Sequence, residues 1–373
     1  MKYTDEYLKD MERSLASIPG VEGLFGKSVF VTGATGLIGS AIVELLSAMN
    51  RKYNAGIRLT LAGRSKEGVA KRFECLLSVD DYSFVPFDAL NPGVLSGKTD
   101  LIIYGAGISN PVLYSTEPVE TLLGNILGLR AALELARENE GSRVLFISSS
   151  EVYGNRMNNQ SDNKSDNKSD NKSDDHSGND PAQAQLPFKE EDYGFVDILN
   201  PRACYPSGKR AAETMCAAYG AEYGVDTVMV RPGHIYGPTI TNADMRASAM
   251  FSRDAAEGRN IVMKSAGTQL RSYCHALDCA SAILTVLLKG ESGKAYNISN
   301  PDSICTIREI AEAFAEAGGA EVVFENPSDQ EKKGYNLMTN SSLDSERLTG
   351  LGWKACFSLE EGTRRTVEEL REN

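Results

Sequence analysis

Three glycines at positions 33, 36 and 39 constrain the fold of this chain more than any other feature. They follow a β-branched run, Ser28–Thr32, and open an amphipathic stretch that continues to Met49. Between a strand and a helix, this spacing permits a tight turn, a close approach of the backbone to a pyrophosphate, and close packing of helix on strand. Free N–H groups and the dipole at the helix start attract the phosphates. The spacing therefore predicts a Rossmann-type α/β fold with a dinucleotide cradle formed by Thr32, Gly33, Thr35, Gly36, Leu37, Ile38 and Gly39.

Short β-branched runs alternate with amphipathic stretches over the first two thirds of the chain. This alternation predicts right-handed crossovers and a doubly wound parallel sheet. The expected strands are Ser28–Thr32, Ile57–Ala62, Phe84–Phe87, Leu101–Tyr104, Val144–Ser148 and Thr227–Arg231. The expected helices are Leu37–Met49, Val119–Glu138, Pro206–Tyr223, Met245–Glu257, Ala276–Leu288 and Thr306–Ala317. The looser pattern after Arg231 predicts a smaller mixed lobe over the carboxyl edge of the sheet, where open α/β sheets bind ligands.

We divide the chain into three parts and one insert. Residues 1–26 are expected to form a helical N-terminal extension. Residues 27–231 and 268–290 form the Rossmann domain, and residues 232–267 and 291–373 form the substrate-binding lobe. Ser161–Lys172 contains three copies of Ser-Asp-Asn-Lys, and the polar run continues to Asp180. Because this segment has no apolar residue to bury, we predict a disordered loop over 161–180.

Composition excludes several classes of partner. The 373 residues are 41% hydrophobic and 24% charged, which is typical of a globular protein with a large core. A net charge of −12 disfavours nucleic acid and anionic membranes as general partners. The seven cysteines include no Cys-x-x-Cys pair, so they indicate reduced thiols rather than a metal site or a disulfide framework. With no signal peptide and no membrane-spanning run, the sequence predicts a cytoplasmic protein.

Further cofactor contacts are expected at the ends of the next three strands. The position that often carries an acid for the ribose 2′-hydroxyl is not acidic here, and Arg64 follows the second strand. Arg64 could pair with a 2′-phosphate, stack on adenine or lie in solvent, so NAD and NADP both stay open, with a slight preference for NADP. Asp88 is either a partner of the adenine amine or an ordinary turn residue. The remaining candidates are Ala89, Gly105, Ala106, Gly107 and Asn125.

Tyr205 and Lys209 stand four residues apart, so a helix starting there would present both side chains on one face. Pro206 is tolerated in the first helical turn. A phenol with a pKa of about 10 is a poor base at neutral pH. A nearby ammonium and an oxidised nicotinamide both favour the phenolate. Ser148-Ser149-Ser150 end a strand at the cofactor edge, where a serine hydroxyl can bond the substrate oxygen that Tyr205 deprotonates. We therefore predict coupled transfer of a hydride and a proton.

Together these motifs resemble the extended short-chain dehydrogenases/reductases of the nucleotide-sugar epimerase/dehydratase type. The similar segments are TGATGLIG (Thr32–Gly39), SSSEVYG (Ser148–Gly154), PRACYPSGKR (Pro201–Arg210), RPGHIYGP (Arg231–Pro238), GTQLRSYCHALD (Gly267–Asp278), YNIS (Tyr296–Ser299) and LGW (Leu351–Trp353). The resemblance implies a catalytic triad of Ser149, Tyr205 and Lys209. It also implies a nucleotide-sugar substrate, contacted by Ser150, Arg231, His234 and Arg271. Finally, it implies a homodimer in which the helices Val119–Glu138 and Pro206–Tyr223 form a four-helix bundle with their copies.

Within this family, the local pattern is most similar to the UDP-glucuronate decarboxylases. A 4,6-dehydratase of this kind would carry Asp-Glu after the catalytic hydroxyl, whereas this chain has Ser150-Glu151. Oxidation at C4 of a glucuronosyl ring gives a β-keto acid that can lose its carboxylate, after which the cofactor returns the hydride. Glu151 would act as an acid/base in the proton steps, or as a structural carboxylate that caps nearby N–H groups. His234 departs from the family pattern, which usually has Asn there.

Three hypotheses of function remain open at this point. The first is a nucleotide-sugar enzyme that regenerates its cofactor, as a decarboxylase, a 4-epimerase or a 4,6-dehydratase. The second is a net NADP-dependent reductase of a keto sugar or polyol phosphate. The third is a non-catalytic dinucleotide sensor, against which the complete set of Ser149, Tyr205 and Lys209 argues.

Overall fold

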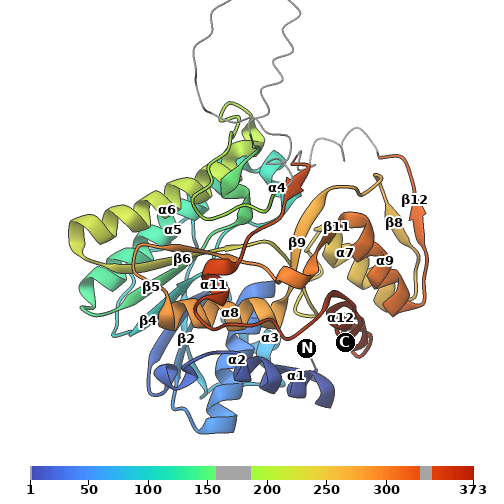
Figure 1. Cartoon of the computed structure of the whole chain (residues 1–373). Helices are drawn as coiled ribbons and strands as arrows, with labels where there is room; N and C mark the ends of the chain where they lie inside the picture. The colour runs from blue at the N-terminus through green and yellow to red at the C-terminus, as the bar shows by residue number, and fades with distance from the viewer. Residues whose placement is uncertain (1, 157–185, 328–337) are drawn as a thin grey trace, which may run out of the picture.

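The computed structural model describes residues 2–156, 186–327 and 338–373, so the predicted disorder at 161–180 lies outside the described residues. The molecule is built on a parallel sheet of seven strands in the order β10-β6-β5-β4-β1-β2-β3 (Figure 1). The strands are β1 (Ser28–Thr32), β2 (Arg58–Gly63), β3 (Tyr82–Pro86), β4 (Leu101–Tyr104), β5 (Arg143–Ile147), β6 (Asp226–Pro232) and β10 (Ala295–Ile298). Strand order reverses beside β1, which confirms the predicted doubly wound fold.

Helices cover both faces of this sheet, which explains why its strands are near-continuous apolar runs. On β1, Val29 and Val31 face one core and Phe30 faces the other, as the two-residue period of a strand requires. The first core is closed by α2 (Leu37–Tyr53) and α8 (Ala276–Lys289). The second is closed by α5 (Pro118–Glu138) and α6 (Cys204–Tyr223).

A smaller lobe with its own core lies beside the carboxyl edge of the sheet (Figure 1). Its four-stranded sheet contains β7 (His234–Tyr236), β9 (Leu270–His275), β11 (Ile304–Thr306) and β13 (Asn340–Ser341). A parallel pair, β8 (Ile261–Met263) and β12 (Val322–Phe324), forms its outer rim. Its helices are α7 (Ala247–Ala256), α9 (Ile307–Gly318) and α12 (Leu359–Arg371).

The division of the chain between the lobes differs from our prediction at two strands. β10 belongs to the stretch assigned to the substrate lobe, yet it pairs with β6 as an edge strand of the large sheet. β9 belongs to a stretch assigned to the Rossmann domain, yet it pairs with β7, β11 and β13 in the small sheet. The partners of both strands are distant in sequence, so local pattern did not specify in which sheet each strand lies.

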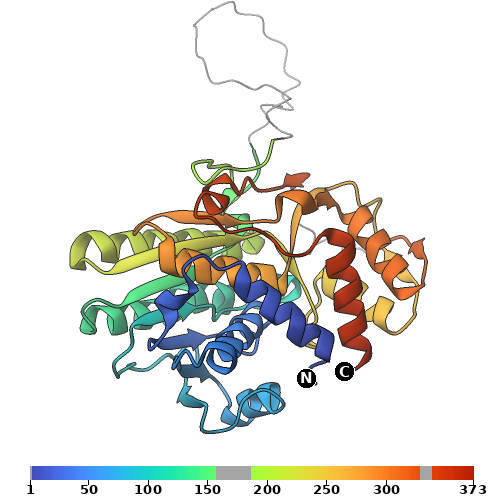
Figure 2. The ribbon, with the colours of Figure 1, turned by 60° about the horizontal axis from the view of Figure 1, so that its bottom comes forward.

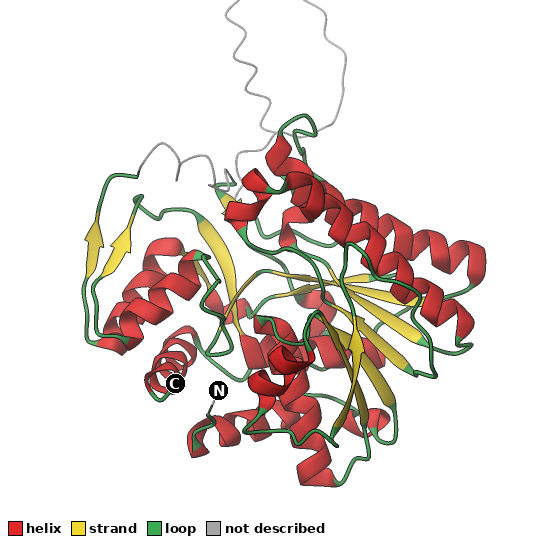
Figure 3. Cartoon of the chain, turned by 180° about the vertical axis from the view of Figure 1, so that it is seen from behind, coloured by secondary structure: helices red, strands yellow, loops and turns green. Residues whose placement is uncertain are grey.

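The predicted N-terminal extension contains α1 (Asp5–Ala16), which contacts α2 and α8. The Tyr7 hydroxyl donates to the carboxylate of Glu44 in α2 at 2.8 Å. Thr4, at the start of α1, contacts Glu369 in α12, so both chain ends lie side by side (Figure 2). The helices of the two lobes are seen from behind in Figure 3. The remaining short elements are η1 (Val21–Leu24), α3 (Lys66–Phe73), α4 (Pro111–Thr116), η2 (Ser150–Tyr153), η4 (Pro201–Ala203), η5 (Pro301–Ser303) and α11 (Glu346–Thr349).

Candidate active site

The glycine loop joins β1 to α2 and packs on the loop after β4. Gly33 has a φ of +69°, and a Cβ there would lie 2.5 Å from the carbonyl oxygen of Gly105. A Cβ at Gly39 would collide with the carbonyl oxygen of Gly33. The Thr32 hydroxyl oxygen accepts hydrogen bonds from the N–H groups of Gly105 at 3.0 Å and Ala106 at 3.1 Å. Because Gly36 caps α2 without a side chain, the first N–H groups of the helix stay available to a pyrophosphate.

The other predicted cofactor residues surround this cradle. Asn125 in α5 donates to the Thr121 carbonyl at 2.8 Å, while its buried Oδ1 has no partner among the described residues. That oxygen lies 3.3 Å from where a Cβ of Gly107 would stand, on the loop after β4. A glycine-lined backbone and an unpaired buried acceptor fit a bound dinucleotide. Arg64 is exposed after β2, and Asp88 Oδ1 accepts from the Leu90 N–H at 3.0 Å as a turn residue does. The cofactor roles of these residues, and of Thr35, Leu37, Ile38 and Ala89, stay predictions.

Tyr205 and Lys209 lie in the first turns of α6, and both side chains are buried. Lys209 Nζ donates to the carbonyl oxygen of Ile147, the last residue of β5, at 2.8 Å. Burial lowers the pKa of Lys209 to about 7, an effect that the nearby carboxylate of Glu213 opposes. The Tyr205 ring stacks on Tyr114 in α4 with a centroid separation of 4.4 Å.

Ser149 is the second residue after β5 and caps the start of η2. Burial and the carboxylate of Glu151 raise the pKa of Tyr205, whereas hydrogen bonds with Ser149 and Tyr114 lower it. The fold thus brings together the three residues of the predicted triad, Ser149, Tyr205 and Lys209, although two different elements carry them. Their catalytic roles stay predictions.

Glu151 is held by an arginine that the sequence reasoning did not single out. Arg202 in η4 forms a two-pronged ion pair with it, with Nη1–Oε2 at 2.7 Å and Nη2–Oε1 at 2.9 Å. The Arg202 guanidinium also lies 5.0 Å from the ring centroid of Tyr114, the same ring that stacks on Tyr205. Its Nε is buried and has no partner among the described residues. The PRACY motif contained this arginine, but nothing local linked it to Glu151.

The predicted substrate residues fall into two groups. His234 in β7 and Arg271 in β9 come from adjacent strands of the small sheet, and Arg271 donates to the carbonyl oxygens of Leu270 and Met338. Burial, together with Arg271 and Arg246, lowers the pKa of His234 to about 3, so this imidazole is neutral. Its Nδ1 has no partner in the described part of the chain. Ser150 is buried at the start of η2.

Arg231 lies apart from this group, within the large lobe. Its guanidinium pairs with both carboxylate oxygens of Glu213, at 2.9 Å from Nε and 2.6 Å from Nη2. Its Nη1 donates to the Tyr153 hydroxyl at 3.0 Å and to the Glu190 carbonyl at 2.8 Å. All three guanidinium nitrogens of Arg231 therefore donate hydrogen bonds within the protein. A second missed residue, Arg246 at the start of α7, pairs with Asp244 and lowers the pKa of Tyr205.

Two further properties bear on the class of protein. Within the described ranges, no helix has the length and apolarity that crossing a membrane requires, and no group of His, Cys, Asp and Glu is arranged to hold a metal ion. All seven cysteines are free.

A glycine cradle for a dinucleotide, with a buried Tyr205 and Lys209 and a half-buried Ser149 at the carboxyl edge of the sheet, defines an enzyme of the dehydrogenase/reductase class. The family model for the NAD dependent epimerase/dehydratase family matches residues 29–299. The chain therefore belongs to this family, which confirms the resemblance read from its motifs, and NAD is the family's cofactor.

Curated relatives of similar sequence are decarboxylases. UDP-glucuronic acid decarboxylase 1 of Xenopus tropicalis is 27% identical over 98% of this chain and 78% of its own length. UDP-glucuronic acid decarboxylase 6 of Arabidopsis thaliana is 27% identical over 92% of this chain and 88% of its own length.

Solved structures of similar fold include an epimerase and a dehydratase. UDP-glucose 4-epimerase from Thermotoga maritima, solved with UDP-glucose, has a TM-score of 0.70 at 19% identity and covers 92% of this chain and 99% of its own. dTDP-glucose 4,6-dehydratase from Bacillus anthracis, solved with NAD, has a TM-score of 0.68 at 19% identity and covers 93% and 97%.

Proposed function

We propose that this enzyme decarboxylates a nucleotide-linked uronic acid, most similarly to the UDP-glucuronic acid decarboxylases, and regenerates its cofactor. The observation that carries the proposal is the ion pair of Glu151 and Arg202 on the aromatic stack of Tyr114 and Tyr205. It provides a carboxyl acid/base and a cation for an anionic substituent beside the phenol. The curated relatives, which span nearly the whole chain, support the same activity.

The proposed reaction begins at C4 of the sugar ring. Tyr205 removes the proton of the C4 hydroxyl while Ser149 hydrogen-bonds the same oxygen, and Lys209 stabilises the phenolate. Bound NAD would supply the hydride acceptor for this oxidation and would later return the hydride to C4. The 4-keto group is β to the carboxylate, so the C5–C6 bond can break, with its electron pair forming an enolate and carbon dioxide leaving. A proton then adds at C5.

Further side chains of the site have proposed roles in these steps. Glu151 would deliver or hold the proton at C5, and Arg202 would face the carboxylate of the substrate. Ser150, His234 and Arg271 would contact the sugar or the diphosphate. A neutral His234 can donate one hydrogen bond to a phosphate oxygen without adding charge.

A panel of nucleotide sugars, read by mass spectrometry, tests the proposal. Conversion of a nucleotide uronic acid with loss of carbon dioxide supports it. Loss of water would identify a 4,6-dehydratase, and a new isomer of unchanged mass would identify a 4-epimerase. Net consumption of NADH or NADPH would instead identify a reductase. The Tyr205→Phe variant should lose turnover by about 10²- to 10⁴-fold while still binding NAD, which checks that the activity comes from this site.

We also propose that the protein is a homodimer located in the cytoplasm. For the cofactor, we propose that Arg64 determines whether the site accepts NADP as well as NAD. α5 presents Val119 and Leu123 to solvent, and burial of such apolar side chains in a four-helix bundle would stabilise a dimer. Seven free thiols are consistent with a reducing compartment. The residue directly after β2 is the exposed Arg64 rather than an acid, so titration with NAD and NADP decides whether Arg64 accommodates a 2′-phosphate.

A further inference from the structure

The two halves of the catalytic group belong to segments that are far apart in sequence. Tyr205 and Lys209 are in α6, while Ser149 and Glu151 belong to the catalytic turn, which we define as Ser149–Gly154. Hydride and proton can move together only if these two pieces are held in register to within a fraction of an ångström. The contacts that hold the catalytic turn against α6 are therefore relevant to the rate.

Arg231 joins the two pieces directly. On one side its guanidinium group donates to both carboxylate oxygens of Glu213, which follows Lys209 by one helical turn in α6. On the other side it donates to the hydroxyl of Tyr153 in the catalytic turn at 3.0 Å, and its guanidinium carbon lies 5.0 Å from that ring's centroid. Arg231 is only 4% exposed, so these interactions are shielded from solvent.

Arg210 makes a second connection between α6 and the catalytic turn. It lies in α6 directly after Lys209, and its Nε donates to the carbonyl oxygen of Val152 at 2.6 Å. Its Nη2 donates to the carbonyl oxygens of Tyr153 at 3.2 Å and Gly194 at 2.9 Å. The backbone of the catalytic turn is thus fixed from α6, while Arg231 fixes its tyrosine side chain.

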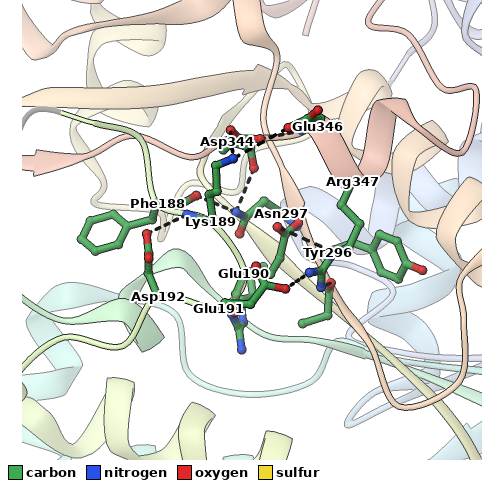
Figure 4. A network of polar contacts seen from close by, with 12 residues as sticks. Phe188, Lys189, Glu190, Glu191, Asp192, Tyr296, Asn297, Asp344, Glu346 and Arg347 are labelled. Carbon is green, nitrogen blue, oxygen red and sulfur yellow. Dashed lines mark hydrogen bonds and ion pairs between the residues drawn. The ribbon is translucent and has the colours of Figure 1, made fainter. Parts of the chain in front are cut away.

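A polar network around Asn297 and Arg347 extends this arrangement to β10, α11 and the segment that contains Phe188 and Glu191 (Figure 4). The Tyr153 hydroxyl donates to Asn297 Oδ1 in β10 at 2.5 Å. Asn297 Nδ2 donates to the carbonyl oxygens of Phe188 and Asp344, each at 2.9 Å, and its N–H donates to Glu190 Oε1 at 2.9 Å. Arg347 donates to Glu191 and to the Ala295 carbonyl. The catalytic turn is thereby tied to residues that lead into the substrate lobe.

Arg231 also determines the electrostatic surroundings of Lys209. Glu213 is close enough to Lys209 to favour its charged form, but both of its carboxylate oxygens are paired with Arg231. The Lys209 ammonium group remains bonded to the Ile147 carbonyl, beside the catalytic turn. Without Arg231, the unpaired Glu213 carboxylate would compete for the ammonium group and draw it away from Tyr205.

We propose that Arg231 is a positioning residue rather than a ligand of the substrate. It holds the catalytic turn against α6 through Tyr153 and Glu213, so that Ser149 meets the hydroxyl of Tyr205. This inference rests on the proposed function only in assigning the reacting residues, because the contacts themselves are independent of the substrate.

The test uses Tyr153→Phe and Arg231→Lys in the full chain with bound NAD. Tyr153→Phe removes only the hydroxyl that links Arg231 to Asn297. Arg231→Lys keeps the charge but lacks the fork that reaches three partners at once. Each variant should lower kcat by about 10- to 100-fold and leave KM for the nucleotide sugar within about twofold, because geometry and not binding is lost.

A second readout does not require turnover. The ionisation of Tyr205 is followed by the ultraviolet absorbance of tyrosinate, as the difference between each protein and the same protein carrying Tyr205→Phe. Both variants should raise the pKa of Tyr205, since a weaker hydrogen bond from Ser149 no longer lowers it. The other groups that face Tyr205, namely Glu151, Arg202, Tyr114, Arg246 and Lys209, are unchanged in sequence. If the sugar panel finds no substrate, this titration still decides the positioning role.

Tyr7→Phe is the matched control. Tyr7 is as buried as Tyr153 and also donates its hydroxyl to a buried group, Glu44, but it lies in α1. It should lower the unfolding temperature without changing kcat or the Tyr205 titration. Two results would overturn the proposal. If Tyr153→Phe and Arg231→Lys behave like Tyr7→Phe, Arg231 is merely structural. If KM rises while kcat and the titration stay constant, Arg231 is a substrate ligand.

Discussion

At the scale of single residues, Lys209 is the side chain whose chemistry depends most on its surroundings. It is buried, and among the described residues its ammonium group donates to one hydrogen-bond acceptor, the Ile147 carbonyl. Burial lowers its pKa from 10.5 to about 7. The folded environment therefore disfavours the charged ammonium group, which the proposed mechanism needs. Function and stability therefore conflict at this position.

Replacing Lys209 by Met should reveal this conflict. A lysine whose pKa is lowered on folding destabilises the protein wherever the unfolded chain is protonated, and the cost grows as the pH falls from about 10.5 towards 7. We therefore expect Lys209→Met to abolish turnover and to raise the unfolding temperature by a few degrees at neutral pH. The gain should shrink as the pH approaches about 10.5. Thermal unfolding of both proteins across this range provides the measurement, and a gain that is independent of pH would contradict the electrostatic explanation.

At the scale of elements, the strand-loop-helix unit β1-α2 contains the glycines that opened the sequence argument. Gly33→Ala should destabilise the fold by about 1–3 kcal/mol because of its left-handed backbone. It should also abolish NAD binding, since the new Cβ would press on the carbonyl of Gly105. Gly26 is the matched control, because it has a similar φ of +70° but open space around it. Gly26→Ala should cost stability and keep NAD affinity, as measured by calorimetry.

The contact between α1 and α2 predicts a pH dependence of stability. Burial raises the pKa of Glu44 from 4.5 to about 7, although the hydroxyls of Tyr7 and Tyr3 and the charge of Arg72 oppose this. An acid with a raised pKa in the folded state contributes stability below about pH 4.5, and this is lost as the pH rises through about 7. Relative to wild type, Glu44→Gln should therefore gain unfolding temperature between about pH 5 and pH 8. Glu12→Gln, at an exposed acid in α1, should show no such trend.

Local sequence was sufficient for six strands of the large sheet, for most of the long helices and for part of the site. β1 and β4 have the predicted bounds, and α9 begins within one residue of the predicted start, Thr306, which forms a capping box with Glu309. The glycine loop and the pair of Tyr205 and Lys209 were also predictable, because their residues are neighbours in one element. Arg202 was not, because its partner Glu151 lies 51 residues away and only the tertiary fold brings the two together. Arg231 was predicted near the substrate, whereas its contacts depend on Glu213 and Tyr153.

At the scale of the whole molecule, the chain passes several times between the large lobe and the small lobe. α8 returns to the large lobe after β9, and β10 completes the large sheet before the chain enters β11 of the small lobe. Periodicity along the sequence cannot show such crossings, because a short buried strand has the same pattern in either sheet. The lobes therefore cannot be separated by cutting the chain once.

The proposed dimer gives a prediction at this scale. Leu123→Arg places a charge beside Val119 on the exposed apolar part of α5, where desolvation in a dimer interface would be costly. We expect it to yield a folded monomer at micromolar concentration, detected by light scattering with an unchanged circular dichroism spectrum. Val79→Arg is the control, because Val79 is also exposed but lies between α3 and β3. A wild-type protein of monomeric mass would refute the dimer itself.

The pairing of the chain ends has a practical consequence. The backbone N–H of Lys2 donates to the side chain of Asn373 at 2.6 Å, yet α1 packs on the large lobe and α12 on the small one. A pair of fluorophores attached at the two ends would therefore report any opening of one lobe against the other. Because the labels would stand next to α1 and α12 and leave every proposed catalytic residue unmodified, they would follow any movement of the lobes on ligand binding in real time.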